Sequence, residues 1–421
     1  MSAPYIWLES SLETPRTTDF LLEKVEQVLK KSDLKETSMG WVRLPEEKKI
    51  LREVQTWYKK VKKNQTTLCV LGIGGSCLGA KAVYDFLQPK KTVLFFDNID
   101  GYSFEHRLGQ LDLKKTHFLA ISKSGETSET LFQLAHILEM IAAKKIKIKD
   151  HITVITEDKP STLKMIAADL NLPSLSVPLD VGGRFSVLSA VGLAPLLWAG
   201  VDVKKMLKGA SWVKGEKLLI ARLCDFYLSS FRREEWISIF WSYVDGLKTF
   251  GLWLEQLWAE SLAKAKTRDG GVAPRASTPL TCIGATDQHS LLQQFTEGAR
   301  DKSFMFLRCK ESETSRKIKK IISSKLFLAK NKSVGELLGI EATATQKILN
   351  DLNLSTIRLV FKKHDAKTMG ALIFIFELLV ATLGECLNVN AHDQPGVEAV
   401  KRVTLGTLGD TRYKDQSLNK S

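Results

Sequence analysis

The chain has 421 residues, more than one hydrophobic core usually organises, so two globular units are expected. A hydrophobic share of 44% and a charged share of 26% are typical of a folded globular protein and argue against disorder. The formal net charge is +14, but the densest basic runs, residues 144–149 and 316–320, alternate with isoleucine and lack clustered aromatic residues. We therefore interpret them as solvated helix faces that can help to steer an anionic ligand, and not as a nucleic-acid site.

Neither export nor metal binding is indicated by the sequence. The N-terminal run MSAPYIWLESS lacks the basic and apolar blocks of a secretory signal. The most apolar stretch, residues 371–384, contains Glu377 and is too short for a membrane span of about 20 residues, so it predicts a buried helix. The six cysteines lie far apart without a Cys-x-x-Cys pair, which argues against a zinc site and a disulfide framework. We expect a cytoplasmic protein with reduced thiols, no metal, no cofactor and no membrane partner.

Strands and helices alternate along the first half of the chain. The first fifty residues are polar with a helical pattern, and an apolar run beginning at Thr67 then breaks into glycines. Further strands are predicted over 92–98, 117–124 and 151–158, with helices over 127–143 and 161–170. This spacing predicts a parallel sheet covered by helices on both faces.

The alternation resumes in the second half, after a boundary near residues 205–235. Four strands are predicted, over 237–243, 278–285, 303–310 and 355–363. Three helices are predicted: one over 245–266, one beginning with the capping box Ser333-x-x-Glu336, and one that follows Gln394 with proline in its first turn. The sequence therefore predicts an α/β protein made of two units.

Two loops follow predicted strands and have the composition of a phosphate site. In the first, Gly72 to Ser76, a dinucleotide fingerprint would need a third glycine where Cys77 stands, and Asp97 is the nearest acidic candidate for the ribose, so this interpretation is weak. Gly75 would instead let the backbone approach a small ligand, with the Ser76 hydroxyl beside it.

The second loop, Ser122-Lys123-Ser124-Gly125-Glu126-Thr127, ends a predicted strand and opens a predicted helix. Its hydroxyls and the helix N-terminus suit a phosphate monoester without a metal. The same residue types also form ordinary caps and turns. The density of hydroxyls favours the phosphate interpretation.

Several segments, in this order, resemble the phosphoglucose isomerase family, in its shorter bacterial form: LGIGGSCLGA, ISKSGETSET, GGRFSVLSAVGL, EQLWAES, TDQHSLLQQFTEG and DQPGVEAVK. The serine-rich loop alone is typical of the broader sugar-isomerase (SIS) domain, whereas GGRFSVLSA and DQPGVE are more specific. The resemblance implies two SIS-type domains, each a mostly parallel sheet flanked by helices. The smaller would span 53–205, and the larger 1–52 and 206–421.

The resemblance also implies a reaction, the isomerisation of glucose 6-phosphate to fructose 6-phosphate through a cis-enediol, and a homodimer with a shared active site. Glu260 would be the base, Arg184 would lie beside the reacting carbons, and His289 and Lys401 would assist ring opening. The implied substrate-binding residues are Gly75, Ser76, Ser122, Lys123, Ser124, Thr127, Gln256 and Gln394. The family's pattern changes beside the site: Ala80 replaces proline, Ser261-Leu262-Ala263-Lys264 lacks the glycine found after the serine, and Ala399-Val400 replaces a pair ending in glycine.

The catalytic side chains also have ordinary alternatives. Glu260 shares a helix face with Gln256 and Trp253, yet most helical glutamates are simply solvated. Arg184 follows two glycines, which lets a guanidinium approach a ligand, but it could equally form a surface ion pair. His289 could pack at a helix start, and Lys401 could be an exposed cation near a helix end.

Two other functions compete with isomerisation. A non-catalytic sugar-phosphate sensor would keep the loop at Ser122 but has no need of Glu260, Arg184 and His289 together. A nicotinamide dehydrogenase is disfavoured by Cys77. The combination of a carboxylate base, a fixed cation and a phosphate loop favours isomerisation.

Overall fold

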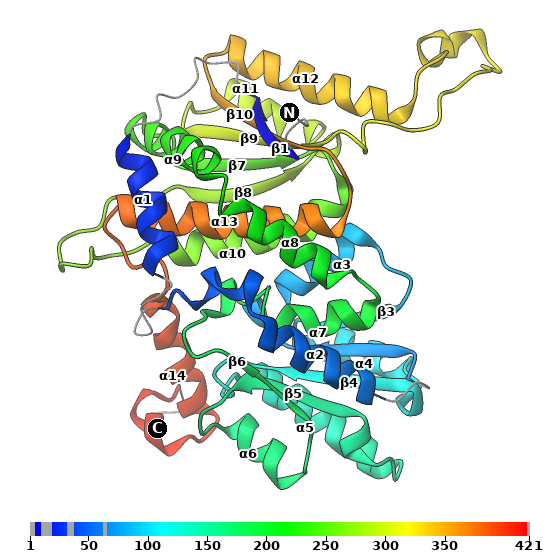
Figure 1. The fold of residues 1–421 in the computed structure, drawn as a ribbon, viewed down its shortest axis with the longest axis vertical. Coiled ribbons are helices and arrows are strands. Elements are labelled where there is room, and N and C mark those ends of the chain that lie inside the picture. Colours follow the sequence, from blue (N-terminus) through cyan, green and yellow to red (C-terminus); the bar gives the residue numbers. More distant parts are fainter. Residues whose placement is uncertain (1–4, 10–18, 32–37, 62–64, 419–421) are drawn as a thin grey trace.

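The computed structural model describes residues 5–9, 19–31, 38–61 and 65–418, and it contains two five-stranded sheets (Figure 1). Seven of the eight strand pairings in the described residues are parallel, and the pairing of one edge strand is antiparallel. The predicted α/β fold with two mostly parallel, helix-flanked sheets is therefore confirmed. The predicted domain limits stay a prediction; the first sheet lies within 53–205 and the second within the remaining chain.

The first sheet has the strand order β3-β2-β4-β5-β6 and buries both of its faces. Leu68 and Val70 of β2 face one core, while Cys69 and Leu71 of the same strand face another. This alternation explains why the strands read as continuous apolar runs. The strands are β2 (Thr67–Leu71), β3 (Thr92–Phe96), β4 (Thr116–Ile121), β5 (Ile152–Glu157) and β6 (Ser174–Val177). The helices around it are α2 (Lys48–Lys60), α3 (Leu78–Leu87), α4 (Gly101–Gly109), α5 (Ser128–Ala143), α6 (Thr162–Asp169) and α7 (Ala190–Ala199).

The second sheet has the order β1-β10-β9-β7-β8, with β1 antiparallel to β10. One face packs on α11 (Leu292–Glu297) and α12 (Val334–Asp351) through Ile239 and Phe304, and the other faces the core shared with the first sheet. The strands are β1 (Ile6–Glu9), β7 (Ile237–Ser242), β8 (Thr278–Ile283), β9 (Lys302–Cys309) and β10 (Ser355–Phe361). The remaining helices are α1 (Asp19–Lys30), α8 (Val203–Val213), α9 (Lys217–Arg232), α10 (Lys248–Leu262), α11 (Leu292–Glu297), α12 (Val334–Asp351), α13 (Ala366–Cys386) and α14 (Glu398–Thr407).

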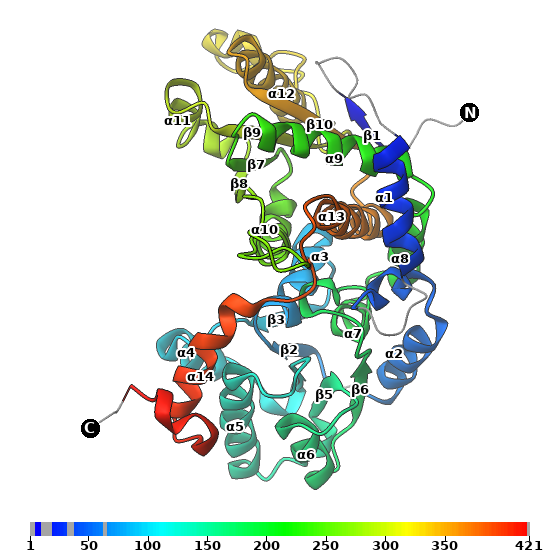
Figure 2. The same cartoon turned by 90° about the vertical axis from the view of Figure 1, so that its left-hand side faces the viewer.

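Three helices, α3, α10 and α13, lie between the two sheets (Figure 2). Helix α13 is long and apolar enough to cross a membrane by length and composition alone, but nearly all of it is buried inside the molecule. The prediction of a buried helix over 371–384 is thus confirmed. After α13 the chain crosses back, so that α14 lies at the level of the first sheet in both views.

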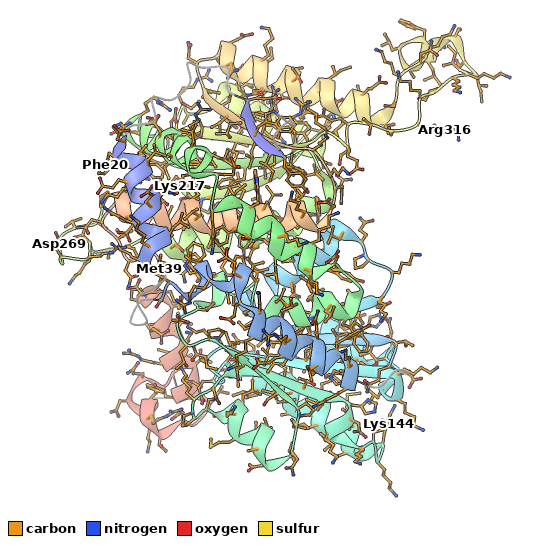
Figure 3. The ribbon with its side chains drawn as sticks, viewed as in Figure 1. Phe20, Met39, Lys144, Lys217, Asp269 and Arg316 are labelled. Atoms are coloured by element: carbon orange, nitrogen blue, oxygen red, sulfur yellow. The ribbon has the colours of Figure 1, made fainter. Side chains whose placement is uncertain are left out.

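Some predicted local structure is wrong. Residues 6–9 form an edge strand rather than helix, and β6 has no counterpart among the predicted elements. The basic runs 144–149 and 316–320 lie in loops rather than on helix faces, and Figure 3 shows Lys144 and Arg316 at the periphery of opposite ends of the molecule. The capping box is confirmed: the Ser333 hydroxyl accepts from the Glu336 N–H at 3.1 Å, and the Glu336 carboxylate accepts from the Ser333 N–H at 2.7 Å.

Candidate active site

Arg184 is the central cation of the site and is almost completely buried, with 2% of its surface exposed. It lies in a short 3₁₀ turn, Gly183–Phe185, at the boundary between the two sheets. Its Nε donates to Ser261 Oγ at 2.7 Å, and its Nη1 donates to Glu260 Oε2 at 3.1 Å and to Gln394 Oε1 at 2.6 Å. Burial lowers the pKa of Arg184, whereas the neighbouring Glu260 carboxylate opposes that shift, so a charged guanidinium is retained.

Glycines let the first loop pack against this arginine. A Cβ on Gly75 would lie 2.4 Å from the carbonyl carbon of Gly183, which no side chain could tolerate. Gly74 has φ +56°, and the side-chain amide of Gln256 lies directly over it. The glycines therefore bring the Gly72–Ser76 loop into contact with both Arg184 and α10. The approach of this backbone to a small ligand stays a prediction.

Glu260 and Gln256 project from one face of α10, four residues apart, as predicted. Gln256 Nε2 donates to Glu260 Oε1 at 3.0 Å, while Arg184 Nη1 holds the other carboxylate oxygen. The Glu260 side chain is 28% exposed, so its carboxylate is held in place and still reaches solvent. Trp253 lies three residues before Gln256 on α10 and contacts the arginine's backbone. Its indole Nε1 donates to the Arg184 carbonyl at 3.3 Å and so fixes the arginine's backbone.

A loop of residues 391–394 closes the site on its other side. Arg184 Nη2 donates to the carbonyls of Ala391 at 2.6 Å and Asp393 at 3.0 Å. Lys264, just after the end of α10, donates to the carbonyls of Glu260 at 2.7 Å and Asp393 at 2.6 Å. The loop that carries Gln394 is therefore tied to the helix that carries Glu260 by two cations.

Sequence reasoning missed Ser261, Lys264 and Asp393 as parts of this arrangement. Ser261 stands directly after Glu260, and Asp393 directly before Gln394, so adjacency to predicted site residues was the available signal. Burial lowers the pKa of the Lys264 ammonium, and its hydrogen bond with Asp393 acts in the opposite direction. Ala263, in the segment that lacks the family's glycine, has φ −77°, so the backbone at this residue does not require glycine.

The hydroxyl-lined loop lies beside the glycine loop because β2 and β4 are neighbouring parallel strands and both loops leave their carboxyl ends. Ser122 Oγ lies 2.8 Å from Thr127 Oγ1 and accepts from the Gly125 N–H at 3.1 Å. Thr127 occupies the N-cap of α5, but its side chain accepts no hydrogen bond from the helix. The first turn of α5 is thus left without a side-chain cap, as an anion site would require.

The other residues of this loop differ in exposure. Ser124 is exposed, and its hydroxyl accepts from the Glu126 N–H at 3.2 Å. Lys123 forms an ion pair with the buried Glu157 at 3.3 Å, and this contact holds its ammonium next to the loop. Ser76 is half-buried in the turn Gly74–Ser76.

Two predicted residues are not brought to the site within this chain. His289 is exposed at the end of a 3₁₀ turn after β8, and among the described residues no hydrogen bond joins its ring to Glu260 or Arg184. Lys401 is exposed on α14 and pairs with Glu398 at 2.8 Å. Within one copy, the clustered site therefore consists of Arg184, Gln256, Glu260 and Gln394, with the two loops beside them.

The fold and this cluster define an α/β protein with two mostly parallel sheets, of the sugar-phosphate isomerase class. The family model "Phosphoglucose isomerase" matches residues 46–416. The chain is 34% identical over 351 residues to a glucose-6-phosphate isomerase of Campylobacter jejuni, covering 81% of this chain and 85% of that protein. It is 31% identical over 406 residues to one of Carboxydothermus hydrogenoformans, covering 89% and 85%.

A solved structure extends this similarity to the fold. A hypothetical protein of Thermus thermophilus has a TM-score of 0.85 and 31% identity, covering 93% of this chain and 95% of that chain. The chain belongs to the phosphoglucose isomerase family, and the expected SIS-type fold is confirmed.

Proposed function

We propose that this protein interconverts glucose 6-phosphate and fructose 6-phosphate by moving a proton between C2 and C1, with Glu260 as the base. The observation that supports this assignment best is a partly exposed carboxylate fixed at both oxygens, by Gln256 and by the buried Arg184. A base must be held within hydrogen-bond reach of the proton it removes, and both contacts fix the carboxylate's position without using all its lone pairs.

Arg184 supplies the positive charge that an enediolate intermediate needs. When Glu260 takes the C2 proton, the C–H electron pair forms the C1–C2 double bond and the carbonyl oxygen gains negative charge. A guanidinium that is already bound and desolvated stabilises that charge without reorganising. The proton of the C2 hydroxyl passes to the negatively charged O1. The electron pair left on O2 then forms the C2 carbonyl while the protonated Glu260 returns its proton to C1, which completes the isomerisation and restores the carboxylate.

The hydroxyl-lined loop binds the phosphate in this proposal. Ser122, Ser124 and Thr127 supply hydroxyls, Lys123 a nearby cation, and the first turn of α5 its N–H groups. Ser76 and the backbone at Gly75 close the other side, while Gln256 and Gln394 contact the sugar. The phosphate thereby anchors the substrate so that its reacting carbons meet Glu260.

We further propose that the protein acts as a homodimer in which His289 of one copy completes the site of the other. His289 lies beside α12, because the neighbouring Gln288 donates to the Glu341 carbonyl and to Thr345 of that helix. The outer face of α12 and the preceding segment, which projects from the molecule in Figures 1 and 3, carry large exposed apolar side chains. They are Ile322, Leu326, Phe327, Leu328, Val334, Leu337, Ile340 and Ile348.

Such a face is costly to leave in water, and a second copy is the occupant that would also deliver the histidine. Lys401 would assist ring opening together with His289.

The protein would act in the cytoplasm without metal or cofactor, so a chelator should leave its activity unchanged. A non-catalytic sensor would leave the Glu260–Arg184 pair without a purpose.

Subunit mixing tests the base and the shared site together. E260Q and H289A homodimers should each be nearly inactive in the conversion of fructose 6-phosphate to glucose 6-phosphate. After mixed refolding, half of the dimers are hybrids, and each hybrid has one intact site, so activity should recover to about a quarter of the wild-type value. No recovery, with dimers confirmed by light scattering, would refute the shared site. An active E260Q homodimer would refute the base.

A further inference from the structure

A groove runs between α2 and the edge strand β6, on the outer side of the first sheet. It consists of two adjoining clefts of about 340 Å³ and 640 Å³, which have Glu53 and Ser176 in common. The larger cleft is lined on one side by α2, through Glu53, Thr56, Trp57 and Lys60. These residues have the i, i+3, i+4, i+7 spacing of one helix face. None of the residues assigned to the isomerase site lines either cleft.

The strand beside this groove has an open edge. β6 ends the first sheet, and its four residues pair only with β5 within the described part of the chain. The Pro173 carbonyl accepts a hydrogen bond from the Val154 N–H of β5 at 2.9 Å. In a parallel ladder every second residue of a strand bonds to the same neighbour, so the N–H and C=O groups of Ser174 and Ser176 point away from β5. Neither serine forms another hydrogen bond among the described residues, so these backbone groups are available to a further strand.

The groove has a defined end and a charge bias. At the carboxyl end of β6, Gly40 lines the smaller cleft and its N–H donates to the Asp180 carbonyl at 2.8 Å, which closes the edge there. At the other end three exposed cations, Arg52, Lys60 and Lys149, line the larger cleft, and none is ion-paired within the described residues. They outnumber the two carboxylates of the same cleft, Glu53 and Asp150. The floor between them is apolar, formed partly by Trp57 and Leu175.

We propose that this groove binds an extended acidic peptide segment of a partner protein, which adds to β6 as a sixth strand. An open strand edge beside a helix supplies main-chain hydrogen bonds, and alternate side chains of the peptide then point into the groove. The open edge is about 13 Å long, which fits a peptide of about four to six residues. The three unpaired cations select acidic side chains at the end near Ser174.

The proposal is tested by fluorescence anisotropy of the full-length protein with a labelled hexapeptide of alternating Glu and Val. The same peptide with Lys in place of Glu should not bind. S176P should abolish binding, because it removes an outward N–H without affecting the bonds to β5, whereas S176A should bind like wild type. R52E/K60E/K149E should weaken binding at least tenfold, and the control K204E/K208E/K248E should not.

Isomerase activity and thermal unfolding should be unchanged in S176P, which separates loss of the edge from loss of the fold. No binding of the acidic peptide to wild-type protein at millimolar concentration would overturn the proposal. Equal binding by S176P and S176A would overturn strand addition. Binding of a labelled oligothymidylate in place of the peptide, sensitive to the charge reversals, would assign the groove to nucleic acid instead.

Discussion

Replacing Glu260 by glutamine removes the proposed base while keeping the length of the side chain. Each carboxylate oxygen accepts one hydrogen bond in the structure, from Gln256 at 3.0 Å and from Arg184 at 3.1 Å. A glutamine amide has only one oxygen, so one of these donors must face an NH₂ group. We expect kcat to fall about 10²- to 10⁴-fold, the contribution of a positioned general base. KM should change less than about fivefold, because the phosphate loop is untouched.

The matched variant is E260D, which keeps the charge but withdraws the carboxylate by about 1.5 Å, one carbon–carbon bond. A displacement of that size costs about 10²-fold when a reacting group must be aligned. The aspartate variant should therefore lie between wild type and E260Q in kcat. This order separates loss of the base from loss of its position.

The measurement is the conversion of fructose 6-phosphate, followed by coupled oxidation of the glucose 6-phosphate formed. Incorporation of deuterium from D₂O into the recovered sugar phosphate reports proton transfer directly, and thermal unfolding checks that each variant is folded. If E260Q keeps its kcat within tenfold of wild type, or still exchanges deuterium at the wild-type rate, Glu260 is not the base.

Three further predictions concern the site's supports and two buried histidines. K264M removes the hydrogen bonds to the Glu260 and Asp393 carbonyls. The free energy of unfolding in urea should therefore fall by about 2 kcal/mol and kcat by about tenfold. If neither value changes, Lys264 does not hold the 391–394 loop to α10. S124A should raise KM about three- to tenfold with kcat nearly unchanged, and an equal loss in kcat would contradict a role in phosphate binding alone. Burial lowers the pKa of His117 and of His392 to about 3, below the usual 6.5, so the unfolded chain binds more protons between these values. The contribution of each histidine to the free energy of unfolding should be complete above pH 6.5 and should fall by up to about 1.4 kcal/mol per pH unit as the pH drops toward 3. H117Q should make this pH dependence, measured by urea unfolding, less steep. An unchanged slope would show that His117 does not have a lowered pKa in the folded protein.

The sequence predicted most of the strands and helices because their signals are local. Strands such as β4 and β5 are buried on both faces and read as apolar runs, and the capping box at Ser333 specifies a helix start by itself. β1 and β6 escaped prediction because each is a four-residue edge strand, which depends on its pairing partner and not on its own composition. The basic run at 144–149 was predicted on a helix face, yet its isoleucines, Ile146 and Ile148, are only two residues apart; α5 ends at Ala143, and the run forms the connection into β5.

The site was predictable only in part, for a related reason. Gln256 and Glu260 lie four residues apart on one helix, so their contact follows from sequence spacing. The contacts of Arg184 join residues separated by 76 to 210 positions, and no local pattern encodes them. Family resemblance supplied the residue, but only the fold shows that Ser261 and the carbonyls of Ala391 and Asp393 are its partners.

Arg184 joins helix α10 to the loop of residues 391–394. Removing a guanidinium from water costs several kcal/mol, and this cost is offset only if its donors find acceptors in good geometry. Here the acceptors come from α10 and from the 391–394 loop, while Gly75 and Trp253 fix the arginine's own backbone. Loss of any one partner would leave part of a buried charge uncompensated, so the same contacts that stabilise the boundary between the two sheets also hold Glu260, the proposed base, in place. Stability and the proposed catalysis are therefore coupled at Arg184. R184K should lower both the free energy of unfolding in urea and kcat.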